Sequence, residues 1–115
     1  MAMEQMPHVG PEEAVRLAGE EGAVLLDVRE QEEWDAGHAP AALHVAMSTI
    51  SGRADDIPTD RLIVCVCRSG GRSAAVTEAL LNGGWKAVNL EGGMQAWEAA
   101  RLPVVDDRDQ PGQVV

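Results

Sequence analysis

Short aliphatic runs that stop abruptly constrain the fold of this chain more than any other feature of its sequence. The most apolar run covers residues 62–67, Leu-Ile-Val-Cys-Val-Cys, and a second run covers residues 23–28, Ala-Val-Leu-Leu-Asp-Val. Apolar runs of this length are typical of strands that are buried on both faces, as in parallel sheets covered by helices. Shorter runs predict further strands at residues 42–46 and 86–90.

Segments with helical signals alternate with these strands. Pro11 and the two glutamates after it suit the first turn of a helix that ends before Gly22. The remaining helical segments are predicted at residues 30–37, 48–57 (a short helix and a loop), 73–82 and 94–100. This alternation predicts an α/β domain with a mostly parallel sheet, and ligands of such sheets bind beyond the carboxyl ends of the strands.

The length of 115 residues fits one domain. We expect this domain to cover residues 5–105, and residues 106–115 to form a flexible C-terminal tail. The only cysteines are Cys65 and Cys67, and a disulfide between such near neighbours would be strained. The sequence therefore predicts free thiols and a cytoplasmic location.

The net charge of −10 argues against several kinds of partner. Nucleic-acid binding requires a basic stripe, which this sequence lacks, and an acidic chain is poorly suited to anionic membrane surfaces. No apolar stretch approaches the length that spans a membrane. His8, His38 and His44 have no ligand spacing with the cysteines, so we expect no metal site and no cofactor.

Residues 67–73, Cys-Arg-Ser-Gly-Gly-Arg-Ser, combine the features of a nucleophile held in an anion cradle. Cys67 stands where the central strand stops, and we expect its sulfur to be exposed there. The adjacent glycines let the backbone turn tightly with its N–H groups inward, and the next helix directs its positive end at the loop. Together with two arginines, these features favour the thiolate, which is the nucleophilic form of cysteine.

The same loop supplies the candidate site residues. Its N–H groups and arginines suit an anionic sulfur donor such as thiosulfate. We assign Cys67 as the catalytic residue, and the candidate substrate-binding residues are Arg68, Ser69, Gly70, Gly71, Arg72 and Ser73. Cys65 lies inside the aliphatic run, where we expect a buried structural thiol; the alternative is a resolving thiol.

Three ordered segments resemble the motifs of the rhodanese family. The loop at residues 67–73 resembles the rhodanese active-site loop. Residues 25–38, which contain Leu-Leu-Asp-Val-Arg, Glu-Trp and Gly-His, resemble the N-terminal signature of the family, and residues 90–104 resemble its C-terminal signature. The resemblance implies a three-layer α/β fold with a mainly parallel five-stranded sheet flanked by helices. It also implies a persulfide intermediate on Cys67.

Other positions of these motifs are expected to be scaffold rather than catalytic: Asp27, Arg29, Trp34, His38, Gly92, Gly93 and Trp97. The chain departs from the family pattern after His38, where it has Pro40-Ala41-Ala42 instead of Pro-Gly-Ala, and at Arg101, where a glycine is usual. These departures lie outside the loop, so we expect them to leave the sulfur chemistry intact. They are expected to affect the rim of the site and therefore the choice of acceptor. For His44, at this rim, we expect a surface role.

The resemblance implies an enzyme similar to thiosulfate sulfurtransferases. Such an enzyme moves a sulfane sulfur from thiosulfate or a persulfide donor to cyanide or a thiol, including a protein thiol. One alternative is a phosphatase or arsenate reductase on the same fold, whose related loop has five residues between cysteine and arginine, whereas this loop has four. The other is a non-catalytic binding module, which usually lacks the cysteine.

Overall fold

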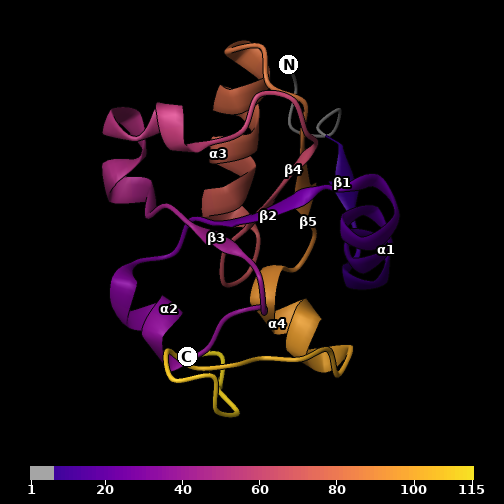
Figure 1. Ribbon diagram of the computed structural model, residues 1–115, viewed down its shortest axis with the longest axis vertical. Helices are drawn as coiled ribbons and strands as arrows, with labels where there is room; N and C mark the ends of the chain where they lie inside the picture. Colours follow the sequence, from indigo (N-terminus) through magenta and orange to yellow (C-terminus); the bar gives the residue numbers. More distant parts are fainter. Residues whose placement is uncertain (1–6) are drawn as a thin grey trace.

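The computed structural model describes residues 7–115. The protein has one parallel sheet with helices on both faces (Figure 1). Within this range the sheet has the order β1-β5-β4-β2-β3, and every pairing between these strands is parallel. The strands are β1 (His8–Val9), β2 (Val24–Asp27), β3 (Leu43–His44), β4 (Ile63–Val66) and β5 (Ala87–Leu90). The predicted α/β class and five-stranded sheet are therefore confirmed. The first two residues of the predicted domain, 5 and 6, lie outside the described residues.

Short helices connect the strands. The α-helices are α1 (Pro11–Glu21), α2 (Gln31–Ala36), α3 (Gly71–Asn82) and α4 (Gly93–Ala99). Two 3-10 helices, η2 (Met47–Gly52) and η3 (Ala54–Asp56), occupy the segment for which the sequence predicts a short helix and a loop. Between residues 7 and 115, no helix is both long and apolar enough to cross a membrane.

The central strand places alternate side chains in two separate cores. Val64 and Val66 pack with residues of α1 and α4 on one face of the sheet, because successive side chains of a strand point to opposite faces. Ile63 and Cys65 pack with residues of α3 and the 3-10 helices on the other face. All four residues of β4 are buried, so the unbroken aliphatic run is explained by helices on both sides (Figure 1).

The strand order creates a switch point between the carboxyl ends of β2 and β4. These two strands are neighbours, but the chain leaving β2 continues to β3 on one side and the chain leaving β4 continues to β5 on the other. Ligand sites of parallel sheets form at such switch points, because the outgoing loops diverge there. The two loops at this switch point carry Arg29 and Cys67.

The residues after α4 run back along α2. The N–H of Gly112 donates to the carbonyl oxygen of Val104 at 2.9 Å, and the N–H of Gln113 donates to that of Ala36 at 3.0 Å. The chain thus folds over the C-terminal end of α2 (Figure 1). The domain boundary predicted at residue 105 stays a prediction.

Candidate active site

Cys67 follows β4 directly and lies beneath the loop that leads into α3. The N–H of Gly70 donates a hydrogen bond to the Cys67 Sγ at 3.1 Å, and the Ser73 hydroxyl donates another at 3.3 Å. Gly70 has a φ of 113°, a left-handed conformation that glycine adopts without a steric penalty. The structure therefore brings both ends of the predicted loop to one sulfur atom and turns a loop amide inward.

These surroundings favour the thiolate of Cys67. Burial raises the pKa of the thiol, but the Ser73 hydroxyl and the backbone N–H groups of Ser73, Gly70 and Ser69 lower it, and the net pKa is below the ordinary value. The N-terminus of α3 lies in the same loop and adds partial positive charge. Hydrogen-bond donors thus provide most of the stabilisation, rather than the arginine side chains.

The sulfur lies deeper than the sequence predicts. Cys67 is only 1 % exposed, whereas an exposed sulfur was expected at the strand end. The reason is that the loop folds back, so that Gly70 and Ser73 close over the Sγ atom. A donor whose reacting sulfur protrudes from the rest of the molecule suits a nucleophile at this depth.

The N-terminus of α4 holds the loop from below. The N–H of Met94 donates to the Cys67 carbonyl oxygen at 2.7 Å, and the N–H of Gln95 donates to that of Arg68 at 2.9 Å. Gly93 has a φ of 58°, and a Cβ atom there would lie 2.6 Å from the Arg68 carbonyl oxygen. Glycine at this position therefore allows the close approach that fixes the loop backbone.

Asn89 is a contributor that the sequence analysis missed. Its side chain, on β5 beside the loop, is buried, and its Nδ2 donates to the Gly70 carbonyl oxygen at 3.2 Å. That oxygen belongs to the peptide group whose N–H is on Gly71, so the bond fixes the orientation of this peptide. The available signal was a polar residue near the carboxyl end of a buried strand, as in Asp27 of β2.

The two loop arginines differ in their surroundings. Arg72 donates from Nη1 and Nη2 to the two carboxylate oxygens of Glu33, each at 2.8 Å, and so links α3 to α2. This contact lowers the pKa of Glu33 to about 2, although partial burial opposes the shift. Arg68 is exposed, and within residues 7–115 its side chain makes no hydrogen bond or ion pair. The binding roles predicted for both arginines stay predictions.

Cys65 lies in the interior, where the sequence analysis placed it. Burial raises the pKa of its thiol to about 11, and a hydrogen bond with Thr77 offsets only part of this effect. At neutral pH it is therefore a protonated, inert thiol. Among residues 7–115, no group of three or more His, Cys, Asp or Glu side chains is placed to hold a metal ion.

Trp34 of α2 stacks on two histidine rings. Its ring stacks on that of His38 at a centroid distance of 3.6 Å and on that of His44 at 4.7 Å. The Nε2 of His44 is 2.7 Å from the Arg29 carbonyl oxygen, so this nitrogen carries the proton. His44 is thus half-buried and packed rather than a free surface side chain.

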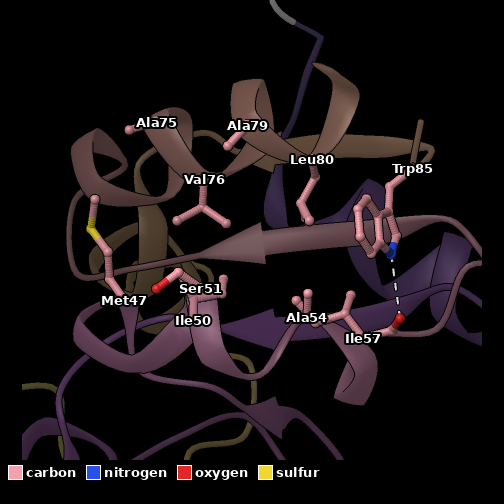
Figure 2. A pocket seen from close by; sticks show the side chains of 10 residues that line it. All are labelled: Met47, Ile50, Ser51, Ala54, Ile57, Ala75, Val76, Ala79, Leu80 and Trp85. Carbon is pink, nitrogen blue, oxygen red and sulfur yellow. Dashed lines mark hydrogen bonds between the residues drawn. The ribbon is translucent and has the colours of Figure 1, made fainter. Parts of the chain in front are cut away.

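An apolar pocket of about 310 Å³ lies between α3 and the 3-10 helices (Figure 2). Its lining residues are Met47, Ile50, Ser51, Ala54, Ile57, Ala75, Val76, Ala79, Leu80 and Trp85. The Trp85 indole donates to the Ile57 carbonyl oxygen at 3.3 Å and closes one end. No residue of the 67–73 loop lines this pocket, and its walls carry no thiol and no charged side chain; the one hydroxyl among the lining residues belongs to Ser51.

The lowered pKa of Cys67 predicts how the alkylation rate of this thiol depends on pH. Because its pKa is lowered, we expect the rate of alkylation by iodoacetamide to rise with pH around a midpoint below that of an unperturbed cysteine. Below that midpoint the sulfur is protonated and the rate falls. Ser73→Ala should move the midpoint upward, since it removes the hydroxyl that lowers the pKa. Peptide mapping by mass spectrometry across a pH series measures this rate.

The exposed Ser51→Ala change serves as the control and should leave the midpoint in place. Cys65 should remain unmodified at neutral pH in every variant. A midpoint that is the same with and without the Ser73 hydroxyl would contradict this account of the thiolate.

Comparisons of sequence and of structure with known proteins all point to the same family. The model of the Rhodanese-like domain matches residues 10–100. A Bacillus subtilis protein named "Putative sulfurtransferase YtwF" is 41% identical over 88 residues, covering 76% of this chain and 85% of that protein. A "Sulfurtransferase" from Allochromatium vinosum is 41% identical over 91 residues, covering 78% and 85% respectively. The crystal structure of a rhodanese-like domain protein from Staphylococcus aureus is 35% identical with a TM-score of 0.75, over 80% of this chain and 91% of that one.

Proposed function

The chain belongs to the rhodanese-like domain family, and we propose that it is a sulfurtransferase that carries a sulfane sulfur as a persulfide on Cys67. The observation that supports this most is the ring of donors at Sγ, with the Gly70 N–H at 3.1 Å and the Ser73 hydroxyl at 3.3 Å. Donors that stabilise a thiolate also stabilise the anion of a persulfide bound to it. Two relatives named as sulfurtransferases, each 41% identical, support the same class of reaction.

In the first half-reaction the Cys67 thiolate attacks the sulfane sulfur of the donor. A bond forms between Sγ and that sulfur, and the sulfur–sulfur bond of the donor breaks. The leaving group takes the electron pair of the broken bond, so thiosulfate releases sulfite and a persulfide releases a thiolate. The loop amides and the Ser73 hydroxyl then hold the persulfide.

In the second half-reaction an acceptor attacks the outer sulfur of the persulfide. The acceptor is cyanide, a small thiol or a protein thiol, and the electron pair of the broken bond returns to Sγ as the thiolate. The sulfane sulfur of the donor supplies the oxidation level of the product, so no external oxidant or reductant is needed, and no step calls for a metal or organic cofactor. Two separate half-reactions predict ping-pong kinetics. A reducing compartment such as the cytoplasm would keep the thiol ready.

Hydrolysis of a phosphate ester is the competing proposal for a Cys-Arg loop. A tetrahedral phosphoryl group needs a cradle open enough to surround three oxygens. Here only four residues separate Cys67 from Arg72, and Cys67 is 1 % exposed beneath the loop. In addition, Arg72 already pairs with Glu33 through both Nη atoms. Transfer of a single protruding sulfur therefore suits this loop better.

Intact-mass spectrometry after mixing with a donor tests the proposed function. We expect a mass gain of one sulfur atom on the protein, located on Cys67 by peptide mapping and reversed by cyanide. A phosphate ester incubated with the same protein should remain intact. Ester hydrolysis without any sulfur loading would contradict the proposed sulfur transfer and would favour phosphatase chemistry.

A further inference from the structure

We infer that Glu33 is a specificity-determining residue, which holds Arg72 in an ion pair and so favours persulfides of uncharged or zwitterionic thiols over sulfonate-bearing donors such as thiosulfate. This inference rests on the proposed sulfur transfer and narrows its donor. It concerns the switch point between the carboxyl ends of β2 and β4, where α2 and α3 carry the two side chains.

Glu33 occupies one bidentate edge of the Arg72 guanidinium, the edge formed by the two Nη atoms. Both Nη atoms donate to Glu33, at 2.8 Å each, and this bidentate arrangement uses the two parallel N–H groups that recognise carboxylate or sulfonate oxygens. Glu33 is itself held from the other side, because its Oε1 accepts the N–H of Glu30 at 3.0 Å. The pair is therefore fixed at both ends. A donor would have to displace Glu33 from this edge, or approach the remaining N–H groups of a guanidinium whose charge is already balanced.

The charge around the sulfur disfavours a dianionic donor. Thiosulfate beside the Cys67 thiolate places three negative charges at one site, and its departing sulfite carries two of them. A persulfide brings at most one negative charge on its sulfurs and leaves as a thiolate. Glu33 neutralises Arg72, which leaves Arg68 as the loop arginine without an ion pair within residues 7–115. In a chain with a net charge of −10, this single cation is weak compensation.

The opposite role for Glu33 would be to orient Arg72 for gripping the sulfonate oxygens. Such a role requires free N–H groups on Arg72 that face the donor. The ion pair uses one N–H of each Nη and leaves the other N–H groups of the guanidinium. Because Glu33 already balances the charge of Arg72, the pairing favours competition for Arg72 over orientation. The two roles predict opposite changes when the charge of Glu33 is removed.

Glu33→Gln separates these roles with little disturbance of the fold. Glutamine at this third helical position can still accept the Glu30 N–H, as in capping boxes, but it no longer neutralises Arg72. We expect kcat/KM for thiosulfate to rise about tenfold relative to kcat/KM for cysteine persulfide, because one guanidinium edge is released to the dianion. Both values are measured with cyanide as acceptor at low ionic strength, and thermal melting verifies the fold of each variant.

Glu32→Gln is the matched control, since it removes the same charge from an exposed position of the same helix. It should leave the ratio of the two kcat/KM values within about twofold of the wild type. An unchanged or lower ratio in Glu33→Gln, or an equal rise for both donors, would overturn the inference.

A binding measurement keeps the inference separate from the proposed function. In the Cys67→Ser background, which cannot turn over, thiosulfate should bind more tightly by calorimetry when Glu33→Gln is added. If the wild type loads sulfur from no donor, the proposed function fails, and this affinity still decides whether Glu33 guards Arg72. If Cys67→Ser binds thiosulfate equally tightly with and without Glu33→Gln, Glu33 does not restrict the access of the donor to Arg72.

Discussion

Cys67→Ser should reduce sulfur transfer by at least about a thousandfold, to the rate of the uncatalysed reaction, while the fold is retained. A serine hydroxyl remains protonated near neutral pH and cannot form the sulfur–sulfur bond on which the proposed intermediate depends. The change replaces one atom, and the new oxygen can still accept the N–H of Gly70 that now bonds the sulfur. Loss of activity would therefore report chemistry rather than misfolding.

Two measurements define this result. Release of thiocyanate from a sulfane donor and cyanide gives the rate, and intact-mass spectrometry shows whether a sulfur atom is gained. Cys65→Ala is the control, because it removes the other thiol, which is buried and has a pKa raised to about 11. This control should still load one sulfur atom. Full turnover by a folded Cys67→Ser protein would show instead that the domain does not use this cysteine.

The central part of the fold could be predicted because burial on both faces leaves a clear trace in composition. Residues 63–66 and 24–27 carry almost only aliphatic side chains, and each lies between helices in the structure. β1 was not predicted from the residues, because two residues, His8 and Val9, carry no periodicity. Its pairing with β5 is a tertiary fact, and the number of strands came from the resemblance to the rhodanese family.

The start of α3 shows where local propensity was misleading. The sequence analysis began this helix at Ser73, because adjacent glycines usually indicate a turn. The structure begins it at Gly71, since Gly70 adopts a left-handed conformation and the N–H of Ala74 already donates to the Gly70 carbonyl oxygen at 3.1 Å. The candidate loop is therefore partly the first turn of a helix, which directs its free N–H groups toward Cys67.

The candidate site could be predicted only where it is contiguous in sequence. The spacing of residues 67–73 was enough to predict the loop, but Asn89 and Glu33 contact it from other elements. Glu33 is 39 positions from Arg72, and no local pattern links the two. The exposure predicted for the Cys67 sulfur was also wrong, because the exposure depends on how tightly the loop closes over it.

The buried pair of Asp27 and Arg29 should carry the largest single contribution to stability among these side chains. Both are fully buried, and Arg29 Nη2 lies 2.7 Å from Asp27 Oδ2. The same Nη2 donates to the Gly37 carbonyl oxygen at 2.7 Å. We expect Arg29→Met to lower the free energy of unfolding by about 3–5 kcal/mol, because it leaves a buried carboxylate without its partner. Urea denaturation followed by tryptophan fluorescence measures this value.

Arg16→Met is the control for a surface ion pair. Arg16 on α1 contacts Glu13 at 2.7 Å, the same separation as in the buried pair, but both side chains are about half exposed. Water compensates for the lost contact there, so the loss of stability should be far smaller. Equal losses in the two variants would show that burial does not set the strength of these pairs.

A second replacement distinguishes an unpaired charge from a lost attraction. If the cost of Arg29→Met comes from the stranded carboxylate, then Asp27→Leu combined with Arg29→Met should unfold at a higher urea concentration than Arg29→Met alone. The recovery should be incomplete, because the Gly37 carbonyl and the Arg29 backbone N–H, which donates to Asp27 Oδ1 at 3.0 Å, also lose their partners. A double variant less stable than the single one would mean that attraction within the pair, rather than avoidance of a lone buried charge, dominates at this site.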